Sequence, residues 1–92
     1  MSDSLDNIRD HIDALDNRLV ELLAQRMQYI PKAGEYKRAH NLPALDEVRW
    51  QQATEIRLKQ ARSLGLSEEL VAELYELIHK YTLQIERDLG VR

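Results

Sequence analysis

Two positively charged side chains stand where a long helical pattern calls for apolar residues. From Leu5 onward, apolar residues recur at alternating steps of three and four, which is the seam of an amphipathic, coiled-coil-like helix. The same stepping continues to Arg26 and then to Lys37. An unpaired buried charge costs several kcal/mol, so these cations either pair within the protein or bind an anionic ligand. The apolar seam residues are Leu5, Ile8, Ile12, Leu15, Leu19 and Leu22.

The spacing of Arg26 and Lys37 suits a small anion. On an α-helix they lie about 20° apart around the axis and about 16 Å apart along it, so their long side chains can converge. Arg9 flanks the seam about 25 Å from Arg26, and it can reach the same ligand only from the partner chain of an antiparallel dimer. For Arg9 and Arg49, the spacing alone favours solvated helix charges.

The seam predicts one long helix over Leu5–Lys37, capped by Asp3 or Ser4. Pro31 removes one backbone donor from this helix. We therefore expect a kink within Met27–Pro31 or, as the alternative, a break into two helices.

Two shorter helices follow after a polar loop. Asp46 caps a helix over about Glu47–Ser63, which Gly65 ends, and Ser67 caps a third helix that runs up to Gly90. No segment alternates with a period of two, so no sheet is expected. The predicted fold class is all-α, with one long and two shorter helices per chain.

The chain has 92 residues, which predicts a single domain over 1–92 with one small core. The long helix is a rod of about 50 Å, whereas the shorter helices span about 25 and 33 Å. One chain cannot cover its own seam. We therefore predict an intertwined homodimer, with the long helices exchanged or packed across a two-fold axis.

Composition excludes several classes of function. The net charge of −3, with no broadly basic face, argues against nucleic-acid and membrane partners. The absence of cysteine excludes thiol catalysis and thiolate metal sites, and the spacing of His11, His40 and His79 predicts no metal site. No phosphate-binding loop or nucleophile motif is present. Without a signal peptide pattern or an apolar span, we expect a cytoplasmic protein.

The cationic positions fall within a longer pattern. Arg9, Ile12-Asp13, Arg26, Lys37 and Arg49 stand at intervals that, together with the leucine seam, resemble the all-helical chorismate mutases. The resemblance covers most of the chain. It implies an intertwined helical homodimer with two equivalent sites, each completed by the partner's first helix, and the rearrangement of chorismate to prephenate in aromatic amino acid biosynthesis.

The resemblance also implies roles for individual residues. Arg26 and Arg9 of the partner subunit would clamp the two substrate carboxylates, and Lys37 would donate to the ether oxygen of the breaking bond. Glu86 would face the same oxygen, which makes Lys37, Glu86 and Arg26 the expected catalytic residues. The remaining expected substrate contacts are Asp46 near the ring hydroxyl, Arg49, Trp50 and Thr82.

Such a pericyclic rearrangement needs no nucleophile, metal or cofactor, and the sequence offers none. Catalysis would come from holding the reactive conformer and from fixed donors at the developing negative charge. We therefore expect a cofactor-independent isomerase. A different class of function stays open, namely a non-catalytic helical dimer that binds a dicarboxylate or a partner helix, if Arg26 and Lys37 are paired internally.

Two residues depart from the family pattern. Trp50 stands where the mutases usually have a glutamate that helps to hold the substrate hydroxyl. Isochorismate-pyruvate lyases also lack this glutamate and often carry a run like Arg26-Met27-Gln28-Tyr29. The alternatives are therefore isochorismate-pyruvate lyase activity and mutase activity on the amino analogue of chorismate. Asp46 favours a mutase.

Glu86 replaces a glutamine of many bacterial members. Only a protonated Glu86 donates to a developing oxyanion, so we expect activity to fall as pH rises and Glu86→Gln to flatten the profile. A shifted register of the third helix would make Gln84 the donor instead.

Overall fold

The structure is a computed structural model that describes residues 4–92. Asp3, one of the two predicted caps, lies outside the described residues. The chain forms α1 (Leu5–Ala39), α2 (Glu47–Ser63) and α3 (Glu68–Asp88), and there is no strand within residues 4–92. The predicted all-α class with one long and two shorter helices is confirmed.

Each helix begins at a predicted cap. The side chains of Ser4, Asp46 and Ser67 each accept a hydrogen bond from the backbone N–H three residues further along, at 3.1, 3.1 and 3.2 Å. Each bond satisfies one of the donors that the first helical turn leaves unpaired. The helix boundaries are thus fixed by local chemistry.

The ends of the two shorter helices also follow the prediction. Gly65 and Gly90 adopt φ angles of +68° and +92°, a left-handed conformation that suits glycine just beyond a helix end. In contrast, α1 continues through Pro31 to Ala39, so the alternative of a break into two helices is wrong. The residues that flank Pro31, Ile30 and Gly34, are buried, and their packing holds this part of α1 in place.

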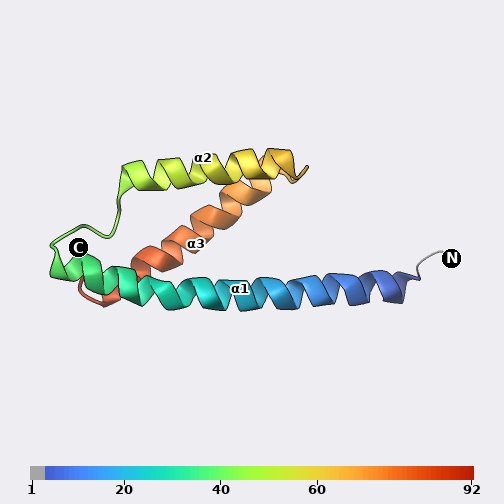
Figure 1. Ribbon diagram of the computed structural model, residues 1–92, viewed down its shortest axis with the longest axis horizontal. Helices are drawn as coiled ribbons and strands as arrows, with labels where there is room; N and C mark the ends of the chain where they lie inside the picture. The colour runs from blue at the N-terminus through green and yellow to red at the C-terminus, as the bar shows by residue number, and fades with distance from the viewer. Residues whose placement is uncertain (1–3) are drawn as a thin grey trace.

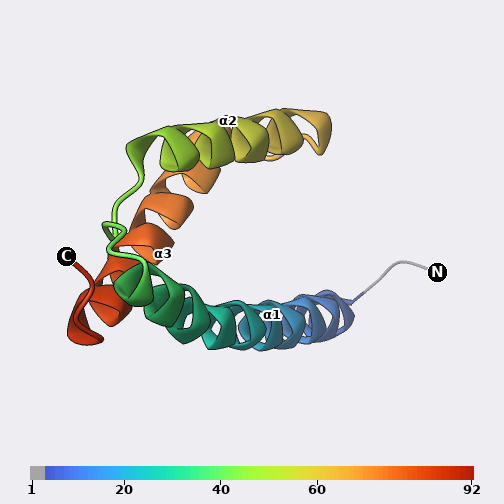
Figure 2. The ribbon, with the colours of Figure 1, turned by 60° about the vertical axis from the view of Figure 1, so that its left-hand side comes forward.

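The helices make an open arrangement in which α3 packs against both α1 and α2. Figure 1 shows α3 running from the end of α2 to the C-terminal part of α1. Figure 2 shows the N-terminal part of α1 extending away from the other two helices. The chain measures 60 × 24 × 14 Å along its principal axes, an elongated shape set by the α1 rod.

We call Leu5–Gln25 of α1 the free arm, because every one of its residues is exposed. The six apolar seam residues on this arm are between 45% and 59% exposed. No helix in residues 4–92 combines the length and the apolar character needed to cross a bilayer. The free arm therefore presents a long apolar stripe that this chain does not cover.

We call the packed part of the chain, formed by residues 26–39 of α1, residues 79–88 of α3 and the following Leu89, the junction. Ile30 is buried there whereas Tyr29 is 66% exposed, so the seam continues through Ile30. A Cβ atom added at Gly34 would lie 3.0 Å from Leu89 Cδ1 and 3.5 Å from Glu86 Cγ. Gly34 thus allows α1 and α3 to approach closely where the seam cations stand.

Candidate active site

Lys37 is held by three acceptors in the junction. Its Nζ donates to Glu86 Oε2 at 2.9 Å, to Glu86 Oε1 at 3.1 Å and to the Ala44 carbonyl at 2.8 Å. The Lys37 side chain is 25% exposed and that of Glu86 only 2%. Of the two alternatives for the seam cations, internal pairing is therefore what Lys37 shows, and all three of its donors are engaged.

Arg26 shows the other alternative. Its Nη1 donates to Thr82 Oγ1 at 3.1 Å, and within residues 4–92 it forms no ion pair with a carboxylate. A guanidinium has five N–H donors in a rigid fork, so most of them remain for an anion. The Arg26 side chain is half-buried, which strengthens any charge-assisted bond that it forms.

The register of α3 decides which polar residues face these cations. Thr82 and Glu86 stand one helical turn apart, and both are buried against Arg26 and Lys37. Gln84 is exposed on a different face. The shifted register that would have made Gln84 the facing residue is therefore wrong.

A cavity of about 610 Å³ opens beside these residues, and α1, α2, α3 and the loop before α2 all contribute to its wall. Glu86 lies behind Lys37, outside the lining. Arg9 lies on the free arm, 17 residues before Arg26 and therefore about 25 Å away along α1. The predicted site residues that line the cavity are Arg26, Lys37, Asp46, Arg49, Trp50 and Thr82.

Sequence reasoning missed His79, which lines the same cavity. Its ring stacks on Trp50 with centroids 3.8 Å apart and an interplanar angle of 7°. The sequence held a signal for it: His79 precedes Thr82 by three residues and Glu86 by seven, and these spacings place all three on one helix face.

Burial lowers the pKa of His79 from its ordinary value of 6.5. The cations Lys37, Arg26 and Arg87 lower this pKa further, while Glu86 opposes the shift. His79 is therefore neutral at pH 7, with one N–H donor and one bare nitrogen acceptor.

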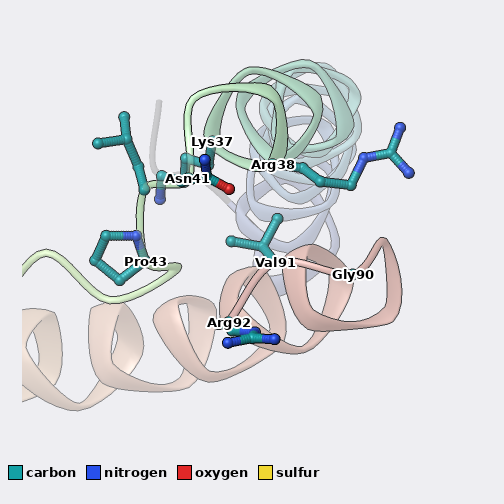
Figure 3. A pocket seen from close by; sticks show the side chains of 8 residues that line it. Lys37, Arg38, Asn41, Pro43, Gly90, Val91 and Arg92 are labelled. Atoms are coloured by element: carbon teal, nitrogen blue, oxygen red, sulfur yellow. The ribbon is translucent and has the colours of Figure 1, made fainter.

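Lys37 also lines a second cavity of about 490 Å³, shown in Figure 3. Its wall includes Arg38, the loop over residues 41–43 and residues 90–92. The backbone N–H of Ala44 donates to the Arg92 carbonyl at 2.6 Å, which ties the loop before α2 to the end of the described chain. This tie fixes the Ala44 carbonyl that holds Lys37, so the second cavity borders the support of the first.

Comparison with known proteins places this geometry in a family. A family model described as "Chorismate mutase type II" matches residues 8–87. The chain is 29% identical over 85 residues to a T-protein of Enterobacter agglomerans, which covers 92% of this chain and 23% of the relative. It is 26% identical over 90 residues to a T-protein of Haemophilus influenzae, covering 98% and 24%.

A further relative is the 4-amino-4-deoxychorismate mutase of Streptomyces pristinaespiralis, 29% identical over 85 residues, with 92% of this chain and 66% of the relative covered. The chain thus spans about a quarter of the length of the two T-proteins it matches. Identity to the T-protein of Enterobacter agglomerans and to this mutase is the same, so overall similarity does not separate the two kinds of relative.

Proposed function

The chain belongs to the chorismate mutase type II family, and we propose that it rearranges chorismate to prephenate without a cofactor. One observation carries this proposal. The side chains of Arg26, Lys37 and Thr82 converge on a cavity of about 610 Å³, and the guanidinium retains free donors for a carboxylate. A dicarboxylate is the class of ligand that suits such a cationic cavity.

In the proposed mechanism, the cavity holds a flexible substrate in its folded, reactive conformer. Arg26 binds one carboxylate through its free N–H groups, and Arg49 at the rim adds a second positive charge. Positioning of this kind lowers the barrier because the substrate loses its conformational entropy when it binds, before the reaction step.

Lys37 supplies the electrostatic part. Negative charge grows on the ether oxygen as the C–O bond breaks, and a fixed donor at that point stabilises the transition state. Because all three Lys37 donors are engaged, one bond to Glu86 must give way to the substrate. The bond to the Ala44 carbonyl keeps the ammonium in place during this exchange.

We also propose a homodimer whose two-fold contact covers the free arm. Six seam residues exposed by 45% to 59% form an apolar stripe too continuous to be left in water. An antiparallel partner would bring the partner subunit's Arg9 to the cavity of this chain. The partner subunit's Arg9 would then bind the second carboxylate, so the substrate would contact cations from both subunits.

A second candidate is mutase activity on the amino analogue of chorismate. One observation favours it: one relative is named a 4-amino-4-deoxychorismate mutase. Isochorismate-pyruvate lyase activity is the other alternative, because Trp50 lines the cavity where the mutases usually have a hydroxyl-binding glutamate.

Incubation with chorismate and with isochorismate tests the proposal. Formation of prephenate from chorismate supports the mutase, whereas salicylate and pyruvate from isochorismate would assign the lyase. No product from either substrate, together with calorimetric binding of a dicarboxylate, would assign the non-catalytic dimer, for which the Lys37–Glu86 pair is the structural argument.

A further inference from the structure

Trp50 and His79 make an aromatic wall at the cavity. Trp50 comes from α2 and His79 from α3, so the stack is built by the packing of the two helices. The rings lie almost parallel, at 7°, with centroids 3.8 Å apart. A stack of this kind restricts both side chains and gives the cavity a flat, rigid side.

His79 keeps its ring nitrogens free, unlike the other two histidines. His11 and His40 each place Nδ1 2.8 Å from the carbonyl four residues earlier on α1. For His79, no hydrogen bond to a ring nitrogen is found in the described part of the chain. A neutral imidazole in a cavity wall thus has a donor and an acceptor to offer a ligand.

The charges around this wall are unbalanced. Asp46 is the single carboxylate among the described lining residues, and it accepts from the Arg49 backbone N–H as the cap of α2. Glu86 lies behind the wall and is paired with Lys37. The cations that line the cavity are Arg26, Lys37, Arg49 and Arg57.

We propose that the Trp50–His79 pair determines substrate specificity, by selecting a ring that carries a neutral hydroxyl over one that carries an ammonium. This inference rests on the proposed mutase function. A hydroxyl can donate to and accept from a neutral imidazole, whereas an ammonium only donates and is repelled by the surrounding cations. Chorismate, a dianion, also balances the cationic lining better than its amino analogue, which has one positive charge more.

The test compares kcat/KM for chorismate and for 4-amino-4-deoxychorismate, with calorimetric binding of both compounds as a second measurement. We expect the wild type to prefer chorismate in both. His79→Leu should lower kcat/KM for chorismate about tenfold, as for a lost hydrogen bond, while His79→Gln, which restores a donor and an acceptor, stays within about twofold. Trp50→Glu should raise the kcat/KM for the amino analogue, relative to that for chorismate, about tenfold, because a carboxylate attracts the ammonium.

His40→Leu is the matched control. His40 forms the other stacked histidine pair, with Tyr36 at 4.0 Å, but it lies exposed at the end of α1 and does not line the cavity. This variant should leave both kcat/KM values unchanged.

A spectroscopic readout separates a stack that faces the ligand from one that only packs. Trp50 is the sole tryptophan, so its fluorescence reports the stack directly. As pH falls, protonated His79 should quench this fluorescence with a midpoint below 6.5, and His79→Gln should abolish the transition. A midpoint at or above 6.5 would contradict the lowered pKa of His79, and a midpoint above 7 would overturn the assignment of a neutral imidazole.

The outcomes separate the two proposals. The wild type can turn over chorismate while His79→Leu and Trp50→Glu leave the ratio of the two kcat/KM values unchanged. In that case the specificity assignment is wrong and the mutase function stands. If the wild type neither binds nor converts either compound, both proposals fail. A wild-type preference for the amino analogue would reverse the assigned specificity.

Discussion

The two parts of α1 share one seam, but they differ in the residues that form it and in how those residues are packed. On the free arm the seam is wholly apolar, yet every residue is exposed in the described chain. In the junction the seam carries Arg26 and Lys37, yet these residues are half-buried and meet partners on α3. The apolar half lacks a partner, and the charged half has one.

The difference assigns the proposed dimer contact to the free arm and the proposed catalysis to the junction of the same helix. The free arm gains free energy only when another surface covers its leucines, at roughly 25 cal/mol per Å² of apolar area. The junction already has its neighbours, so its cations are positioned before any ligand arrives. Substitutions on the two halves should therefore fail in different ways, by losing the dimer or by losing catalysis.

The largest effect is expected from a charge on the free arm. Leu19→Glu would bury a carboxylate in the proposed dimer contact twice, once per subunit, at a cost of several kcal/mol each. We expect a monomer in sedimentation velocity and no detectable mutase activity. Arg18→Glu adds the same side chain one position away, off the seam, and should stay dimeric. A dimeric, active Leu19→Glu would remove the assembly role of the free arm.

Alanine at the junction cations should remove catalysis while leaving the dimer intact. Loss of one preorganised donor costs about 3 to 4 kcal/mol, so Lys37→Ala and Arg26→Ala should each lower kcat by two to three orders of magnitude. Steady-state kinetics and sedimentation measure the two properties separately. Arg38→Ala is the control, because Arg38 is exposed and pairs only with Glu35 at 3.3 Å. Near wild-type turnover of Lys37→Ala would refute the catalytic assignment.

Glutamine at position 86 tests the partner of Lys37. Glu86→Gln keeps the shape of the side chain but removes the carboxylate that accepts from Lys37 Nζ at 2.9 and 3.1 Å. Hydrogen bonds to a charged group are roughly twice as strong as neutral ones, so the ammonium should be held less firmly and kcat should fall about tenfold in steady-state kinetics. A kcat of Glu86→Gln at or above that of the wild type would show that this ion pair does not position Lys37.

A smaller effect is expected from the close approach of α1 and α3. A Cβ added at Gly34 would lie 3.0 Å from Leu89 Cδ1, and a leucine side chain would extend further. The two helices must therefore move apart. Overpacking of this kind costs about 1 to 3 kcal/mol. We expect Gly34→Leu to lower the Tm and to reduce activity by displacing Glu86 from Lys37. Lys32→Leu, on the exposed side of α1, should change neither property; an unaltered Gly34→Leu would mean that the junction tolerates wider helix spacing.

Local features of the fold were predictable because they depend on residues close in sequence. Ser4, Asp46 and Ser67 cap their helices through bonds spanning three residues, and Gly65 ends α2 by its own backbone conformation. The passage of α1 through Pro31 was not decided by the sequence, because this part of the helix packs against residues distant in the chain, as Gly34 does against Leu89 and Glu86.

The site was predictable only in part. The seam identified Arg26 and Lys37 but left internal pairing and ligand binding open, since the answer depends on which face α3 presents. Glu86 pairs with Lys37, whereas Arg26 donates to the neutral Thr82 hydroxyl and Met27 sulfur. The stack of Trp50 on His79 could not be derived, because it joins residues of two helices whose relative register the sequence pattern does not contain.

The central claim is that each site combines the junction of one chain with the free arm of another, and subunit mixing tests it most directly. Arg9→Ala and Lys37→Ala are each expected to be nearly inactive. In a mixed heterodimer one site carries both defects and the other carries none. After unfolding and refolding of an equal mixture, half of the dimers are mixed, so roughly a quarter of wild-type activity should return. An Arg26→Ala and Lys37→Ala mixture should recover nothing, because each site keeps one defect. No recovery with Arg9→Ala would contradict the shared site.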